Sequence, residues 1–156
     1  MKGPLSSLKI LDFSTLLPGP FATLMLSDLG ADVLCIESLS FKKEKFQIPL
    51  SMREYLGRSK RSLALNLKEK SSREIIHRLL NTYDIVIEQF RPGVMKRLSL
   101  DFETLSSIKP SLIYCSLTGY GQTGPYKKRA GHDINYLSLA GLSSYSGTKE
   151  HGPVLG

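Results

Sequence analysis

The fold is decided by residues 8–37, which read LKILDF at 8–13, STLLPGP at 14–20, FATLMLSDLG at 21–30 and ADVLCIE at 31–37. Residues 8–13 are typical of a short buried strand. After the prolines and glycine of 18–20, apolar side chains recur at helical spacing as far as Gly30, and glycine suits the left-handed end of a helix. Residues 32–37 then predict a second strand. This order of strand, turn, helix and strand is the opening of an α/β fold.

The rest of the chain continues the alternation. Residues 38–60 are polar and basic without clear periodicity, which predicts a long functional loop. A Ser-x-x-Glu capping box at 71–74 predicts the start of a helix, with an apolar face formed by Ile75, Ile76, Leu79, Leu80 and Tyr83. Further strands are expected at 62–67, 84–88 and 112–117, and short helices at 92–98 and 101–108. Together these elements predict a parallel sheet with helices on both faces.

The composition is that of one globular domain. The chain has 156 residues, 41% hydrophobic and 22% charged, which excludes a disordered or collagen-like protein. We expect a soluble, cytoplasmic protein, because no apolar run approaches the ~20 residues of a membrane span and no leader sequence follows Met1. The two cysteines, Cys35 and Cys115, lie far apart in apolar runs and predict buried thiols rather than a disulfide or a metal site.

A formal charge of +7 favours an anionic partner. The basic residues form three local clusters, at 42–45, 58–61 and 127–129. Charge alone does not choose between nucleic acid, a membrane surface and a phosphorylated small molecule, and any one cluster could equally be solvated loop charge. No aromatic side chains are interleaved with these clusters, which argues against a platform for stacking nucleic-acid bases.

A glycine-rich segment follows the last predicted strand. Residues 119–124 read GYGQTG and match the spacing of dinucleotide-binding turns, but PYKKR follows instead of an apolar helix. We therefore expect no nicotinamide or flavin cofactor. Glycine in this loop would still let the backbone approach a ligand closely.

Residues 131–136 read GHDINY and begin a largely apolar helical pattern. His132 and Asp133 lie at its start, where free backbone N–H groups could stabilise an oxyanion. The alternative is that His132 is a surface residue and Asp133 is the helix cap.

Two other segments lie at predicted strand ends, at 60–68 and 88–93. In open α/β sheets, ligands bind outside the carboxyl ends of the strands. These segments are therefore candidates for the wall of a pocket, with Lys68, Arg91 and Arg97 as phosphate partners, although ordinary turn chemistry would also place polar residues there.

Several spaced blocks resemble the class III CoA-transferase family, often named for carnitine CoA-transferase. They are LDF at 11–13, PGPFA at 18–22, DLGADV at 28–33, KRSL at 60–63, RPGV at 91–94, LIY at 112–114 and GYGQTGP at 119–125. Within this family, GHDINY at 131–136 is similar to the α-methylacyl-CoA racemase branch. The resemblance implies a Rossmann-like large domain that belongs to an interlocked homodimer and binds an acyl-CoA. Residues 1–156 would be the amino-terminal part of that domain, which would be incomplete, and the family's small domain would be absent.

The resemblance also implies a set of site residues. Ala64, Leu65, Leu67 and Lys68 would line the nucleotide end of coenzyme A, with Gln89, Phe90, Arg91 and Arg97 beside it. Gly131, Asn135 and Tyr136 would face the thioester. His132 would be a general acid/base for the α-proton, and the backbone N–H of Asp133 would stabilise the enolate. Coenzyme A would be part of the substrate, and no metal, redox cofactor, nucleic acid or membrane is expected.

The chain departs from the family pattern in two places. Ser38 stands where relatives often have arginine, and Lys42 or Lys43 could supply the charge instead. The resemblance also places a second catalytic group, an aspartate, beyond Gly156, so this chain is expected to be incomplete for catalysis. A racemase acting on 2-methylacyl-CoA, a CoA-transferase acting between carboxylic acids and a non-catalytic CoA-binding fragment all remain open.

Overall fold

The computed structural model describes residues 3–39 and 49–152. Lys42, Lys43 and residues 153–156 lie outside the described residues. The chain divides into two compact units, residues 1–117 and residues 118–156.

The first unit is built on a five-stranded parallel sheet with the strand order β3-β2-β1-β4-β5. The strands are β1 (Lys9–Asp12), β2 (Asp32–Ser38), β3 (Arg61–Leu65), β4 (Ile85–Glu88) and β5 (Ile113–Ser116). The helices are α1 (Pro18–Asp28), α2 (Leu50–Gly57), α3 (Lys70–Leu79), α4 (Val94–Arg97) and α5 (Phe102–Ile108). The predicted α/β fold with its parallel sheet is confirmed.

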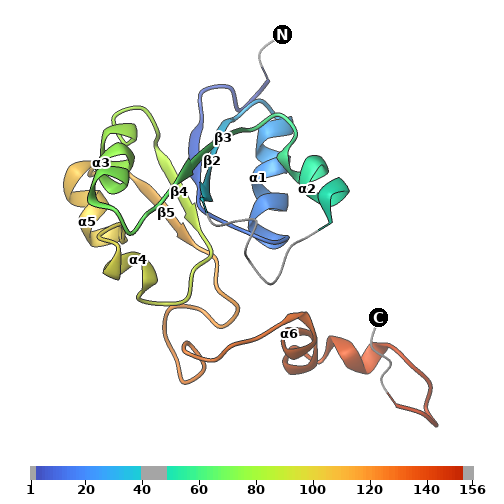
Figure 1. The fold of residues 1–156 in the computed structure, drawn as a ribbon. Helices are drawn as coiled ribbons and strands as arrows, with labels where there is room; N and C mark the ends of the chain where they lie inside the picture. The colour runs from blue at the N-terminus through green and yellow to red at the C-terminus, as the bar shows by residue number, and fades with distance from the viewer. Residues whose placement is uncertain (1–2, 40–48, 153–156) are drawn as a thin grey trace. The chain divides into compact units, whose positions relative to one another are not determined.

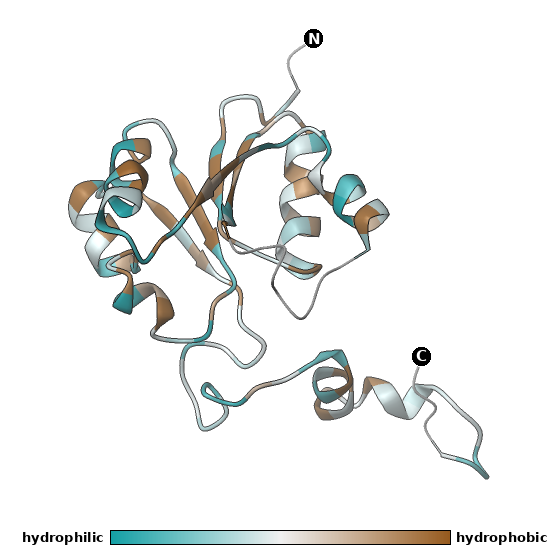
Figure 2. Ribbon diagram, in the orientation of Figure 1, coloured by the Kyte–Doolittle hydropathy of each residue, from teal (hydrophilic) through white to brown (hydrophobic). Residues whose placement is uncertain are grey.

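Helices lie on both faces of this sheet, with α3, α4 and α5 on one side and α1 and α2 on the other (Figure 1). The larger core lies on the first side, where Leu11, Ile36 and Val86 pack with Ile76 and Leu105. A smaller core on the second side contains Ile10, Val33 and Ile87. Because successive residues of a strand point to opposite faces, the apolar strands supply both cores, and they are among the most hydrophobic parts of the ribbon (Figure 2).

Two predictions for this unit are corrected. The capping box at Ser71 is wrong, because helix α3 begins at Lys70 and its N-cap is Glu69, whose side chain makes no capping hydrogen bond within the described residues. The turn that precedes it is already closed by the hydrogen bond from the Glu69 N–H to the Asn66 oxygen at 2.9 Å. The stretch at 38–60 is not a loop throughout, because helix α2 lies within it; of its side chains only Leu56 is buried, too little to give an apolar period.

The second unit contains helix α6 (Asp133–Leu139) and a short 3-10 helix, η2 (Leu142–Tyr145). The Tyr136 ring packs so closely on Gly119 and Gly131 that a Cβ at either glycine would lie within 3 Å of it. Tyr120 adds an edge contact to the same ring, with 5.2 Å between the ring centroids. Over residues 3–39 and 49–152, none of the helices has the length and hydropathy that crossing a bilayer requires.

Candidate functional site

The carboxyl ends of the parallel strands meet at one edge of the sheet, and two cavities open there. The larger, of about 370 Å³, is named here the Lys68 cavity. Its lining residues come from the segments that leave the sheet and from α4: Phe13, Thr15, Ile36, Glu37, Ser38, Leu65, Asn66, Leu67, Lys68, Phe90, Val94, Arg97 and Leu98. This is the edge at which open α/β sheets bind their ligands.

Five of the residues predicted for the nucleotide end line the Lys68 cavity: Leu65, Leu67, Lys68, Phe90 and Arg97. Three others do not. Ala64 points to the opposite face of β3 and is exposed, as is Arg91. The Gln89 side chain instead lies close to Gly19, with an Oε1 atom that is buried and has no hydrogen-bond partner in the described part of the chain.

Local hydrogen bonds shape the turns that carry these residues. The Arg73 guanidinium of α3 donates to the backbone oxygens of Leu67, at 3.1 Å, and Lys68, at 2.7 Å. On the other wall, the Phe90 N–H donates to the buried carboxylate of Glu88, across 2.7 Å to Oε2. Both turns are therefore fixed by side chains of the adjoining elements.

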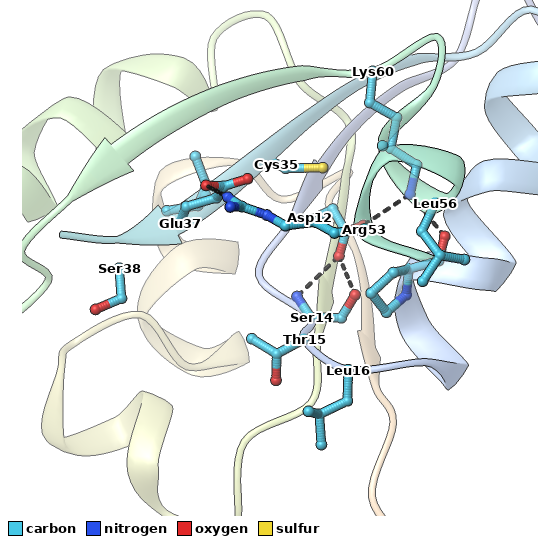
Figure 3. Close-up of a pocket in the computed structure, with 13 residues that line it drawn as sticks. Asp12, Ser14, Thr15, Leu16, Cys35, Glu37, Ser38, Arg53, Leu56 and Lys60 are labelled. Atoms are coloured by element: carbon cyan, nitrogen blue, oxygen red, sulfur yellow. Dashed lines mark hydrogen bonds and ion pairs between the residues drawn. The ribbon is translucent and has the colours of Figure 1, made fainter. Parts of the chain in front are cut away.

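The second cavity, of about 120 Å³, is named here the Lys60 cavity. It is lined by Asp12, Ser14, Thr15, Leu16, Pro20, Cys35, Ile36, Glu37, Ser38, Arg53, Leu56, Gly57 and Lys60 (Figure 3). The two cavities share Thr15 and residues 36–38, so they adjoin along the ends of β1 and β2. Arg53 and Glu37 form an ion pair of 2.6 Å on its wall.

A buried polar cluster underlies the Lys60 cavity. Asp12 and Lys60 form an ion pair with 3.9 Å between Oδ2 and Nζ, and both side chains are 2% exposed. Burial lowers the pKa of the Lys60 ammonium. Burial, followed by the Asp12 charge, raises the pKa of the adjacent Cys35 thiol to about 12. This cluster was not predicted from the sequence, in which its one visible signal is an aspartate at the end of an apolar strand.

The predicted thioester residues lie in the second unit, whereas both cavities are formed by residues of the first. His132, Asp133 and Asn135 are exposed, and Gly131 and Tyr136 are half-buried. The cap of α6 is His132, so Asp133 as the helix cap is wrong, whereas the exposed His132 agrees with the alternative that it is a surface residue. The His132 N–H donates to Asn135 Oδ1 at 2.9 Å, which ties the first turn of α6 to the residue before it.

The parallel sheet with helices on both faces places the chain among the open α/β proteins, which bind their ligands at the carboxyl edge of the sheet. The Lys68 cavity lies at that edge. Within this class, the chain belongs to CoA-transferase family III, whose family model matches residues 5–155. An alpha-methylacyl-CoA racemase of Mus musculus is 40% identical over 149 residues, or 96% of this chain and 37% of the relative. A succinyl-CoA:glutarate CoA-transferase of Homo sapiens is 39% identical over 158 residues, or 97% of this chain and 36% of the relative.

Two solved structures show the same fold. A CAIB/BAIF family protein from Brucella suis superposes with a TM-score of 0.86 and 34% identity, over 99% of this chain and 44% of that chain. A hypothetical protein from Mycobacterium tuberculosis gives a TM-score of 0.82 at 33% identity, over 97% of this chain and 44% of that chain. The chain therefore spans less than half the length of these relatives.

Proposed function

We propose that this chain forms the coenzyme A-binding part of an enzyme that acts on acyl-CoA thioesters, and that the Lys68 cavity takes the nucleotide end of the coenzyme. The observation that carries this proposal is the convergence of Lys68 and Arg97 on one cavity with the apolar side chains of Leu65, Leu67 and Phe90. Two cations suit phosphate groups, and the arginine can bind a phosphate through two parallel hydrogen bonds. Apolar and aromatic walls suit the face of a purine base.

The binding experiment is a calorimetric titration of the chain with coenzyme A. Lys68→Ala and Arg97→Ala should each weaken binding about tenfold, which is the loss of one charge-assisted hydrogen bond to a phosphate. The matched control is Lys96→Ala, because Lys96 is exposed on the same helix as Arg97 but does not line the cavity. Binding that is absent in the unmodified chain, or equal losses in all three variants, would refute this site.

We propose racemisation of 2-methylacyl-CoA as the reaction of the whole protein. His132 takes the proton from the carbon next to the thioester carbonyl, and the electron pair of that C–H bond forms an enolate. The backbone N–H of Asp133 stabilises the enolate oxygen. Return of a proton to the opposite face, by the aspartate expected beyond Gly156, gives the epimer without net gain or loss of atoms. The support is the GHDINY segment and the racemase relative of Mus musculus.

A CoA-transferase is the second candidate, because the human transferase is as similar to this chain as the racemase is. In that reaction an enzyme carboxylate would displace the CoA thiolate from the acyl group and form a mixed anhydride. The thiolate would then attack the enzyme carbonyl of the anhydride, which releases the first acid and leaves an enzyme–CoA thioester. A second carboxylic acid would take the CoA by the same two steps in reverse, which restores the enzyme carboxylate. The two candidates differ in one readout. A racemase exchanges the α-hydrogen of 2-methylacyl-CoA with deuterium from the solvent, whereas a transferase exchanges CoA between two acids.

The reaction experiment uses the longest protein that contains this sequence, together with its His132→Ala variant. Deuterium exchange that falls at least about a hundredfold in the variant supports the racemase role of His132. Undiminished exchange rejects that role, and CoA exchange without deuterium exchange selects the transferase. Coenzyme A binding without either reaction selects the third possibility, a non-catalytic binding module.

A further inference from the structure

The segment Ser14–Leu16 forms one part of the wall between the two cavities, and residues 36–38 form the other. Thr15 lines both cavities, and Ser14 and Leu16 line the Lys60 cavity. Leu16 has a φ of 61°, a left-handed conformation that a leucine adopts only when its surroundings impose it. The segment must therefore be held in place by its neighbours.

Asp12 is the first of these neighbours. Its Oδ1 accepts hydrogen bonds from the Ser14 N–H, at 2.9 Å, and from the Ser14 hydroxyl. Ser14 in turn packs against Gly19 in the first turn of α1, where a Cβ would lie 2.2 Å from the Ser14 Cβ. The start of the segment is thus fixed on one side by the end of β1 and on the other by α1.

Thr23 and Lys60 hold Asp12 in turn. The Thr23 hydroxyl, which is fully buried, donates to Asp12 Oδ2 and accepts a hydrogen bond from Lys60 Nζ at 2.7 Å. Lys60 also donates to the Pro20 oxygen, across 2.7 Å. The ammonium group therefore has Asp12, Thr23 and Pro20 around it inside the protein, an arrangement that suits a buried structural charge rather than a ligand-binding one.

We propose that Thr23 and Lys60 are positioning residues for the coenzyme A site, because through Asp12 they fix the Ser14–Leu16 segment and so place Thr15 on the shared wall. This inference rests on the proposed function. Thr23 and Lys60 then affect the affinity for coenzyme A, although neither residue lines the Lys68 cavity.

The experiment compares two substitutions at one position. Thr23→Val keeps the shape of the side chain but removes the hydroxyl, and Thr23→Ser keeps the hydroxyl but removes a methyl group. The dissociation constant of coenzyme A is measured by calorimetry at a temperature at which circular dichroism shows each variant to be fully folded. Thr23→Val should weaken binding about fivefold, which corresponds to one hydrogen bond of ordinary net strength, and Thr23→Ser should bind as the unmodified chain does.

A third variant, Lys60→Met, should weaken binding at least as much as Thr23→Val. Its control is Asp28→Asn. Asp28 of α1 and Arg58, which follows α2, form an exposed ion pair of 2.6 Å. Neither residue of this pair lines either cavity. Asp28→Asn should leave the dissociation constant unchanged. A general loosening of α1 would weaken coenzyme A binding as much in Thr23→Ser as in Thr23→Val, and as much in Asp28→Asn as in Lys60→Met. That result would overturn the proposal.

The proposal and the proposed function fail in different ways. Failure of coenzyme A to bind the unmodified chain, or indifference of binding to Lys68→Ala, rejects the Lys68 cavity as the nucleotide site. Binding that depends on Lys68 but is the same in Thr23→Val as in Thr23→Ser rejects only the positioning role. A folded Thr23→Val variant that binds more weakly than Thr23→Ser supports the role of Thr23, even where Lys60→Met does not fold. A folded Lys60→Met variant that binds as the unmodified chain does rejects the role of Lys60.

Discussion

The guanidinium of Arg73 donates a hydrogen bond of 2.7 Å to the backbone oxygen of Lys68, and so fixes from α3 the turn that brings Lys68 to its cavity. Arg73→Ala frees this turn and the adjoining Leu67 oxygen. We expect coenzyme A binding to weaken about fivefold, as for the loss of one positioning hydrogen bond. Titration calorimetry measures this. Arg78→Ala is the control, because it removes the same charge from an exposed position of the same helix, and an equal loss in the control would show that only net charge matters.

The core beside α3 should dominate the stability of the first unit. Ile76 is 0% exposed and packs in the larger core, so Ile76→Ala should lower the free energy of unfolding by about 2–5 kcal/mol. Leu50 is 68% exposed at the start of α2, and Leu50→Ala should change the free energy of unfolding by less than about 0.5 kcal/mol. Urea denaturation followed by circular dichroism compares the two variants. Equal losses of unfolding free energy in the two variants would mean that the core between α3 and the sheet is not the main core of the first unit.

Two glycines should respond in opposite directions to alanine. Gly57 ends α2 without a left-handed φ, and a Cβ there meets nothing within 4 Å, so Gly57→Ala should stabilise the chain by about 0.4–1 kcal/mol. Gly30 has a φ of 101°, and a Cβ would lie 2.9 Å from the Gly3 Cα. Gly30→Ala should therefore destabilise the chain by more than about 1 kcal/mol. Thermal unfolding of both variants tests the sign of each effect.

The sequence predicted the sheet well because each strand is a short apolar run between helical patterns. Gly30 as the end of the first helix follows from the same local reasoning and is confirmed by its positive φ. Helix α2 was not predicted, because Leu56 is its only buried side chain and one residue gives no apolar period. The start of α3 was predicted at Ser71 because Ser71 and Glu74 match a capping box, but the hydrogen-bonded turn at 66–69 leads directly into a helix that begins at Lys70.

The candidate site was predicted in part, for a reason of topology. Strand order alone predicts Lys68, Arg91 and Arg97 at the shared carboxyl edge of the sheet, and Lys68 and Arg97 line the cavity whereas Arg91 does not. Leu65 and Phe90 were predicted by the resemblance to the family, not by topology. The pairing of Asp12 with Lys60 could not be predicted in this way, because it joins residues 48 positions apart through the packing of α1 against the end of β1. The position of Asp12 at the end of an apolar strand indicates a buried carboxylate, but nothing in the sequence identifies Lys60 as its partner.

The two cysteines should differ sharply in reactivity. The prediction of a buried thiol is wrong for Cys115, which is exposed at β5, whereas burial and then the Asp12 charge raise the pKa of Cys35 to about 12. Because only the thiolate reacts, an alkylating reagent at about pH 8 should modify one thiol rapidly in the folded chain. Cys115→Ser should abolish this rapid phase, and Cys35→Ser should leave it intact; mass spectrometry of the labelled peptides identifies the site.

The same shift in pKa has a consequence for stability. The folded chain holds the Cys35 proton more tightly than the unfolded chain does, whose thiol has an ordinary pKa near 9. The contribution of Cys35 to the free energy of unfolding is therefore present below about pH 9 and is lost as the pH rises to about 12. In Cys35→Ser this part of the alkaline decline should disappear, as measured by urea denaturation across that range. A decline of equal slope in Cys35→Ser and in the unmodified chain would show that the thiol is not held protonated by the fold.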